Sequence, residues 1–216
     1  MPHPNKAIAI DGLLSALAAA RIGATFNPFA DRGPDDVADA PAIRVANLRY
    51  YLRARPGADV LAVGEAAGYQ GMRWSGIAFT SERTLARWGL PYRPTSLGRK
   101  GGWSEPSGTI VHGLLEELGV EDRVILWNTV PTHPHHPGRP LSNRRPTREE
   151  IEQGRVLLDQ LMAAVKPKLL VAVGRIAESM LAGSGAVYVR HPAQSGATAF
   201  RRGMREAIQA AAHHPE

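Results

Sequence analysis

The 216-residue sequence contains no cysteine, and this absence excludes several classes of protein together. Disulfide-stabilised scaffolds, thiolate zinc sites, iron–sulfur clusters and thiol enzymes all need cysteine. Long apolar runs are absent as well: none approaches the roughly 18–20 residues of a membrane-spanning helix, and the N-terminus lacks the pattern of a signal peptide. We therefore expect a protein that does not cross a membrane and that works in the cytoplasm.

Lysine is also scarce, because arginine supplies all but four of the 26 basic residues. With 20 acidic residues the formal net charge is +6, and the isoelectric point is near 10.0. This balance favours a polyanionic partner, and the planar guanidinium group suits phosphate in particular. A general bias towards alanine and arginine in the proteome would give the same composition, so the charge alone does not identify nucleic acid as the partner.

The pattern of apolar segments predicts one α/β domain over residues 1–216. Four short, almost continuous apolar runs are typical of strands buried on both faces of a parallel sheet, and they occupy residues 59–64, 123–128, 168–174 and 186–191. Helical patterns occupy residues 7–22, 41–55, 109–118, 147–165, 176–181 and 200–212. Alternating strands and helices predict a three-layer α/β/α sandwich with a central four-stranded parallel sheet. An N-terminal helical segment (1–56) precedes the expected catalytic core (57–212).

Polar side chains stand at the ends of three predicted strands, where the ligands of such sheets usually bind. Glu65 follows the first strand, Asn128 ends the second, and His191 ends the fourth. Because the carboxyl ends of parallel strands meet at the same edge of a sheet, a carboxylate, an amide and an imidazole come together there. The sequence therefore predicts a site at this edge.

The glycine turn after the first strand does not match the common nucleotide-binding loops. Residues 64–68 read GEAAG, whereas the dinucleotide fingerprint needs a glycine where Ala66 stands and a phosphate-binding P-loop ends in Gly-Lys-Ser/Thr. These absences count against a nucleotide-metabolising enzyme. The simplest structural explanation of the motif is a tight strand-to-helix turn, in which the helix dipole favours the carboxylate of Glu65.

A longer set of motifs, over roughly residues 59–205, resembles the uracil-DNA glycosylase superfamily. GEAAGYQG (64–71) and SGIAFT (75–80) resemble the branch whose first motif reads GEAPG and is followed by a G-x-P-F segment. NTVP (128–131), PGRP (137–140) and NRRPTREE (143–150) resemble a later block of that branch, and HPA (191–193) resembles the superfamily's HPS motif. The resemblance implies an enzyme that flips uracil out of DNA and hydrolyses its N-glycosidic bond in base excision repair.

The resemblance also implies a role for each matching residue. Glu65 would stabilise the oxocarbenium-like sugar and orient the attacking water, and His191 would stabilise negative charge on the departing base. Asn128 would read O4 and N3–H of uracil, and Phe79 would stack on the flipped base. The rest of the base pocket would be Gly64, Ala66, Gly68 and Tyr69. The expected DNA contacts are Arg144, Arg145, Arg190, Gln194, Ser195 and Gly196.

Several positions depart from the family pattern. Ala67 replaces the proline of GEAPG, and Ala193 replaces the serine of HPS, whose hydroxyl would contact DNA. Gly68 stands where the best-known branch has a tyrosine that bars thymine, and residues 194–198 offer no bulky wedge for the duplex. The GEAPG branch binds an iron–sulfur cluster through four cysteines, so this chain resembles a cluster-free relative.

Other interpretations stay open at this point. Asn128 could make only backbone hydrogen bonds, Phe79 could be a core residue, and His191 could belong to a structural loop. The HPHH segment (133–136) is better explained as a loop beside a strand end than as a metal site. Its histidines do not lie on a predicted helix that would hold them at the spacing of metal ligands. The alternatives for function are a non-catalytic binder of uracil-containing or damaged DNA, and a glycosylase for hypoxanthine or xanthine. We expect a monomeric glycosylase for double- or single-stranded uracil-containing DNA that needs no metal or other cofactor.

Overall fold

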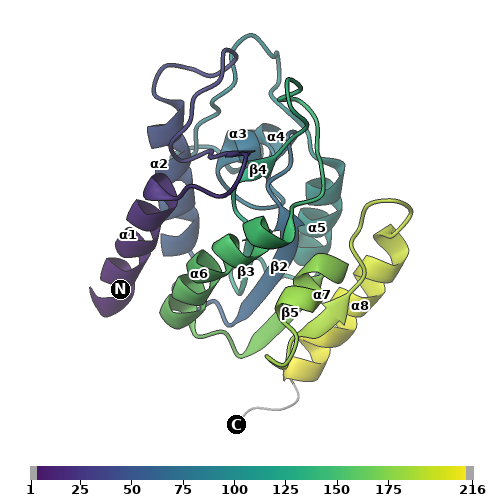
Figure 1. Cartoon of the computed structure of the whole chain (residues 1–216). Helices are drawn as coiled ribbons and strands as arrows, with labels where there is room; N and C mark the ends of the chain where they lie inside the picture. Colours follow the sequence, from purple (N-terminus) through teal and green to yellow (C-terminus); the bar gives the residue numbers. More distant parts are fainter. Residues whose placement is uncertain (1–3, 213–216) are drawn as a thin grey trace.

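Four parallel strands form the central sheet, in the order β3-β2-β5-β6 (Figure 1). The strands are β2 (Val60–Ala66), β3 (Val124–Val130), β5 (Leu169–Val173) and β6 (Val187–Val189). Val60 pairs with Val124 on one side and with Leu169 on the other, so three strands start at the same level. The computed structural model describes residues 4–212, and its sheet confirms the predicted four-stranded parallel arrangement.

Helices cover both faces of this sheet (Figure 1). α6 (Arg148–Val165) packs against β3, and α7 (Arg175–Met180) packs against β2 and β5. α8 (Ala197–Ala212) contacts β5 and β6 and lies beside α5 (Pro106–Glu117). Right-handed crossovers place α6 and α7 on one face and α5 on the other. The three-layer α/β/α sandwich is therefore confirmed, with helix boundaries close to those predicted.

The N-terminal helices close the open edge of the sheet at β3. α1 (Pro4–Ala19) packs against α6, and α2 (Ala40–Arg53) packs against α1. The Tyr51 hydroxyl of α2 accepts a hydrogen bond from the N–H of Leu126 (2.9 Å) and donates one to the carbonyl of Val124 (3.3 Å). These groups belong to an edge strand, so α2 satisfies backbone atoms that would otherwise be open to pairing with another strand.

Four short elements are not predicted by the sequence patterns. α3 (Met72–Ser75) and α4 (Glu82–Trp88) lie between β2 and α5, and β1 (Thr25–Phe26) pairs with β4 (His133–Pro134). Such elements are too short to show a periodicity, and tertiary contacts fix them. Asp36 binds the guanidinium groups of both Arg44 and Arg73 in a buried cluster, which joins the N-terminal loop to α2 and α3.

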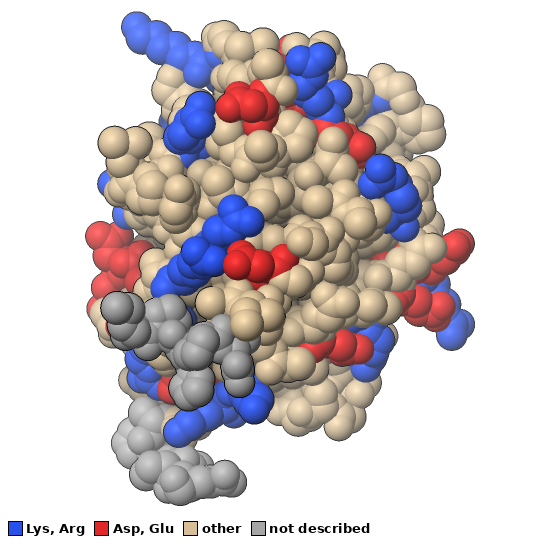
Figure 2. Space-filling model, turned by 90° about the vertical axis from the view of Figure 1, so that its left-hand side faces the viewer, with Lys and Arg blue, Asp and Glu red and all other residues tan. Residues whose placement is uncertain are grey.

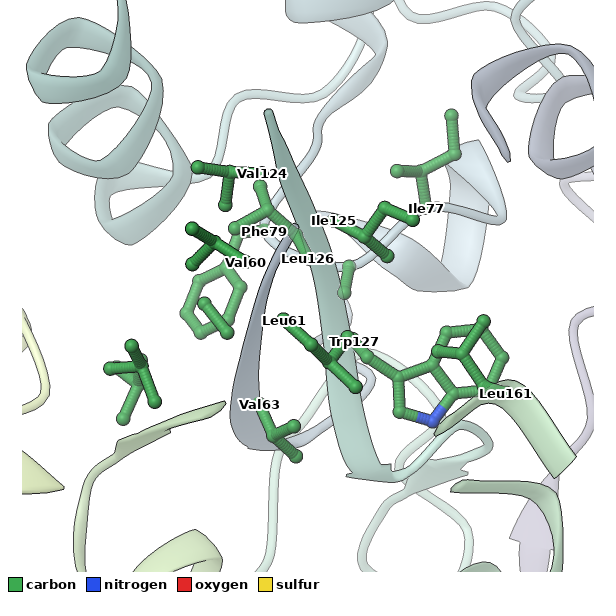
Figure 3. Close-up of a cluster of buried hydrophobic side chains, with 14 of the residues drawn as sticks. Val60, Leu61, Val63, Ile77, Phe79, Val124, Ile125, Leu126, Trp127 and Leu161 are labelled. Carbon is green, nitrogen blue, oxygen red and sulfur yellow. The ribbon is translucent and has the colours of Figure 1, made fainter. Parts of the chain in front are cut away.

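The hydrophobic core lies on both sides of β2 and β3 (Figure 3). Val124 and Phe79 lie on one side of these strands, whereas Ile125 and Trp127 lie on the other. Successive side chains of a strand alternate between faces, so a strand covered on both faces is apolar throughout. Leu13 of α1 belongs to the same cluster, so the N-terminal helices share one core with the sheet.

The side of the molecule formed by α1 and α2 carries no concentrated basic patch. Figure 2 shows this side, with positive and negative side chains scattered among uncharged ones. Asp11, for example, pairs with both Arg49 and Arg53. Within residues 4–212, no helix is both long enough and apolar enough to span a membrane.

Candidate active site

A cavity of about 660 Å³ lies at the carboxyl ends of the strands. Its wall combines the end of β2, the start of α5, the loop before α6, the start of α7 and the turn after β6. Eight of the residues predicted from the sequence line it: Glu65, Ala66, Gly68, Arg144, Arg145, Arg190, His191 and Gln194. The structure thus brings the two predicted catalytic residues to one cavity.

Glu65 lies at the end of β2 and is half-buried in the cavity wall. Burial raises the pKa of its carboxyl group, and the nearby Arg145 guanidinium opposes that rise. Glu65 does not cap a helix, because the next helix, α3, begins only at Met72. A carboxylate that is partly desolvated beside an arginine can orient a water molecule or stabilise a developing cation.

His191 follows β6 and presents one ring nitrogen as a hydrogen-bond donor. The backbone N–H of Ala193 donates to its Nδ1 at 3.1 Å. A neutral imidazole that accepts at Nδ1 carries its proton on Nε2, so Nε2–H remains available to a ligand. Burial, with a smaller contribution from Arg190, lowers the pKa of His191 to about 4. The ring is therefore neutral at pH 7 and acts there as a hydrogen-bond donor, not as an imidazolium.

Phe79 and Asn128 lie behind the cavity wall. Their exposed fractions are 5% and 3%, and neither side chain lines the cavity. Both press against Gly64, because a methyl group built on this glycine would lie 2.7 Å from Oδ1 of Asn128 and even closer to the Phe79 ring. The Phe79 ring is also 5.8 Å from the His191 ring, with an interplanar angle of 35°.

In this structure neither side chain is open to a ligand in the cavity. Each stacking contact needs roughly 3.5 Å, so a base does not fit between the Phe79 and His191 rings as they stand. Asn128 Nδ2 donates one hydrogen bond to Sδ of Met72, at 3.3 Å. The roles of Phe79 and Asn128 in binding the base therefore stay predictions.

Arginine side chains surround the mouth of the cavity. Arg145 and Arg190 are exposed and form no ion pair with any residue in the described range, so both are available to phosphate. Arg175 also lines the cavity and pairs with Glu178. Arg144 differs, because its guanidinium binds both carboxylate oxygens of Glu150, at 2.6 and 2.8 Å. That bidentate pair ties the loop to α6 and leaves Arg144 less free to bind DNA.

The other predicted residues shape the turns of the cavity. The N–H of Tyr69 donates to Oδ1 of Asn143 at 3.0 Å, which joins the first motif to the loop before α6. Gln194 and Ser195 both have left-handed backbones, with φ of 53° and 62°. Successive non-glycine residues in this conformation are uncommon and cluster at functional turns. At Gly196, any methyl group would clash with the carbonyl of His191.

The sequence analysis did not assign Asn143 or Glu105 to the site, although both line the cavity. Glu105 stands directly before Pro106 at the start of α5, where an acidic residue usually indicates a helix cap. Its side chain makes no capping hydrogen bond and reaches the cavity wall instead. The Glu-Pro pair was a visible signal, but only the fold shows where the carboxyl group points.

The HPHH segment lies just after β3, and its first two residues form β4, which pairs with β1. His133 is buried, and its Nδ1 lies 2.8 Å from the carbonyl of Ala67, which links the segment to the first motif. Among the described residues, no group of three or more histidine and acidic side chains is placed to hold a metal ion.

Comparisons with known proteins agree with this geometry. The structure is similar to a crystal structure of wild-type SMUG2 from Pedobacter heparinus, with a TM-score of 0.67 and 12% identity, covering 95% of this chain and 99% of that one. At that identity the similarity shows the fold alone. No curated protein sequence matches the chain. The family model of the uracil DNA glycosylase superfamily matches residues 53–213, and the chain belongs to that superfamily.

Proposed function

We propose that this protein is a monofunctional DNA glycosylase that removes uracil from DNA. Membership of the superfamily supports a DNA glycosylase, that is, a hydrolase of N-glycosidic bonds. The observation that carries the finer proposal is the shared cavity of Glu65 and His191 at the strand ends, with the exposed Arg145 and Arg190 at its mouth.

Glu65 and His191 act on different parts of the substrate during hydrolysis. As the C1′–N bond breaks, its electron pair goes to the base and the sugar becomes cationic. Glu65 stabilises that cation and accepts a proton from the water that attacks C1′. The Nε2–H of His191 donates a hydrogen bond to a base oxygen, where negative charge develops. A neutral imidazole does this without repelling the sugar cation.

Asn128 and Phe79, which lie behind the cavity wall, recognise the base. Asn128 offers a donor and an acceptor to N3–H and O4 of uracil, and Phe79 offers a ring face. Asn128 is buried and hydrogen-bonded to Met72, so its side chain reaches a base only after a local rearrangement. Side-chain rearrangement of this size is common when ligands bind.

The first test is excision from single- and double-stranded oligonucleotides that contain one uracil, with a metal chelator present. We expect wild type to release uracil, and Glu65→Gln and His191→Ala to do so at least 10²-fold more slowly. Salt-dependent binding of wild type without any abasic product would contradict catalysis and favour a non-catalytic binder. Undiminished activity in both variants would overturn the assigned roles.

A second test concerns the base. Asn128→Asp exchanges an amide donor for an acceptor, so we expect the ratio of uracil to cytosine excision to fall. An unchanged ratio would remove Asn128 from base recognition. The cavity of about 660 Å³ also has room for a purine. The same assay should therefore include hypoxanthine and xanthine, whose faster release would replace uracil as the substrate.

A further inference from the structure

The turn after β6 carries no side chain that could replace a flipped base in a duplex. A base that leaves the stack opens a gap, and proteins that bind unstacked DNA often insert an apolar side chain such as leucine or phenylalanine. Residues 194–198, at the edge of the cavity, read QSGAT, and none of these side chains is large and apolar. An apolar side chain that fills the gap therefore has to come from another segment.

Leu141 is the exposed apolar side chain closest to the cavity along the chain. The large apolar side chains that are exposed among the described residues are Ile8, Tyr50, Leu90, Leu97, Leu141, Val156 and Val187. Single exposed apolar side chains are ordinary on protein surfaces, so exposure alone assigns no role. Of this set, only Leu141 stands within two residues of a cavity residue, because Asn143 lines the wall. Two residues span at most about 7 Å, so Leu141 lies at the mouth of the cavity.

Hydrogen bonds fix the shape of the turn that precedes Leu141. The N–H of His136 donates to Oγ of Ser142 at 3.1 Å, and that hydroxyl donates to the carbonyl of Arg139 at 2.7 Å. The N–H of Arg139 donates in turn to the carbonyl of His136 at 3.0 Å. A side chain on an ordered turn loses less conformational freedom when DNA binds than one on an unstructured loop. The turn therefore presents Leu141 in a form that is suited to insertion.

The same turn is anchored to the first motif of the cavity. Nδ1 of the buried His133 ring lies 2.8 Å from the carbonyl of Ala67, and its Nε2 lies 3.1 Å from the carbonyl of Pro140. Pro140 directly precedes Leu141, so this ring sets the distance between the leucine and the motif that contains Glu65. In Figure 1 the segment between β4 and α6 rises above the start of α6.

Positive charge surrounds Leu141 along the chain. Residues 134–148 contain no aspartate or glutamate, and their four arginines are Arg139, Arg144, Arg145 and Arg148. Arg139 and Arg145 are exposed and form no ion pair with any residue that the structure describes. Exposed arginines hold DNA through its phosphates, whereas an apolar side chain gains free energy only where it leaves water. The segment combines the two properties that a duplex with one open base step requires.

We propose that Leu141 is the wedge that enters the duplex and fills the space left by the flipped uracil. This role rests on the proposed glycosylase activity. The arginines of the same segment hold the phosphates, and Leu141 contacts the bases on either side of the gap. Insertion offsets the free energy lost in unstacking, so the wedge acts on uracil in a duplex far more than on uracil in a single strand. Leu141 is thus a positioning residue, which acts before the bond breaks.

The decisive experiment compares single- and double-stranded substrates under single-turnover conditions. Each oligonucleotide carries one uracil, which is either in a single strand or opposite adenine in a duplex. We expect Leu141→Ala to lower the ratio of the double-strand to the single-strand rate by roughly tenfold or more. An unchanged ratio, which a merely structural role would give, would overturn the proposal. Leu90→Ala makes the same chemical change at an exposed residue that does not line the cavity, and it should leave both rates unchanged.

A conservative variant tests whether apolar volume is what matters. Leu141→Met keeps an apolar side chain of similar size, so its ratio of rates should stay within about threefold of wild type. A loss as large as that of Leu141→Ala would contradict a wedge. If Leu141→Ala does not fold, as judged by circular dichroism, Leu141→Gln replaces it with the same expected ratio, since its side chain is polar.

A fluorescence measurement follows the wedge without hydrolysis. 2-Aminopurine placed beside uracil in a duplex becomes brighter when its neighbour leaves the stack. Glu65→Gln, which hydrolyses slowly, should produce this rise on binding, and the double variant Glu65→Gln/Leu141→Ala should produce less than about half of it. Equal rises would overturn the wedge.

The two proposals fail in different ways. A wild-type protein that releases uracil from single strands but not from duplexes would overturn the wedge and leave the proposed function intact. A wild-type protein that releases uracil from neither would overturn the proposed function, and the 2-aminopurine signal of wild type beside Leu141→Ala would then decide the wedge alone.

Discussion

The inner wall of the cavity and its rim handle charge in opposite ways. We define the inner wall as Glu65, Glu105 and His191, and the rim as Arg145 and Arg190. Burial raises the pKa of Glu65 and Glu105 and lowers that of His191, so on the inner wall it favours the neutral form of each group. The rim arginines, by contrast, are exposed to solvent. The comparison indicates that desolvation prepares Glu65 and His191 for proton and electron-pair chemistry, and that exposed charge attracts the polyanion.

The largest expected effect is on the inner wall, at His191. Removal of its Nε2–H in His191→Ala should slow the single-turnover release of uracil 10²- to 10³-fold. Because the pKa of His191 is lowered to about 4, the wild-type rate should show no acidic limb near pH 6.5. Rates measured from pH 5 to 8 check this point. A limb near pH 6.5 that disappears in the variant would show that His191 acts as an imidazolium.

The next effect is on stability. Glu105 has a raised pKa, so the folded state binds more protons than the unfolded state between the ordinary value of 4.5 and about 7. Its contribution is therefore unfavourable above pH 7 and vanishes below about pH 4.5. Glu105→Gln should raise the free energy of unfolding by up to about 3 kcal/mol at pH 8, and by much less at pH 5. Urea denaturation at the two pH values measures the difference. Equal effects would show that Glu105 is ionised in the folded protein.

A smaller effect should follow from moving, not removing, the Glu105 carboxyl. The added methyl group of Gly71→Ala would clash with that carboxyl. Because the displaced Glu105 would disturb the cavity wall, we expect uracil release to slow roughly tenfold, with little change in DNA affinity. Gly57→Ala is the control, since nothing lies within 4 Å of its added methyl group. Wild-type rates in both variants would mean that the wall tolerates a shift of the carboxyl.

The smallest effects belong to the rim. Arg145→Ala and Arg190→Ala should each weaken DNA binding by about three- to tenfold and lower the salt dependence by about one phosphate contact. The rate of uracil release from the bound DNA should hardly change. Arg53→Ala, in α2 and away from the cavity, is the control and should leave both properties unchanged. A slower chemical step in the rim variants would show that the rim arginines also act in hydrolysis.

The sequence predicted which side chains meet at one edge of the sheet, because strand ends in parallel sheets converge. Glu65 and His191 follow different strands and reach one cavity, as expected. Glu105 has no strand before it, and its neighbour Pro106 makes it look like an ordinary helix cap. Phe79 and Asn128 were expected at the base, yet they lie closed behind the wall against Gly64. The packing of side chains around a glycine cannot be seen in a linear pattern.

The sequence by itself determined the layers, the parallel sheet and the edge at which the site lies. These features follow from local periodicity and from the chirality of strand connections, which each segment carries on its own. Only the tertiary structure decided which groups are desolvated, which nitrogen of His191 carries the proton, and which arginines remain unpaired. Those properties arise from contacts between distant segments, such as Ala193 on His191 and Glu150 on Arg144. Because the chain has no cysteine, packing and other noncovalent contacts hold the scaffold without disulfides. Contacts of the same kind set the burial and the hydrogen bonds of the site residues.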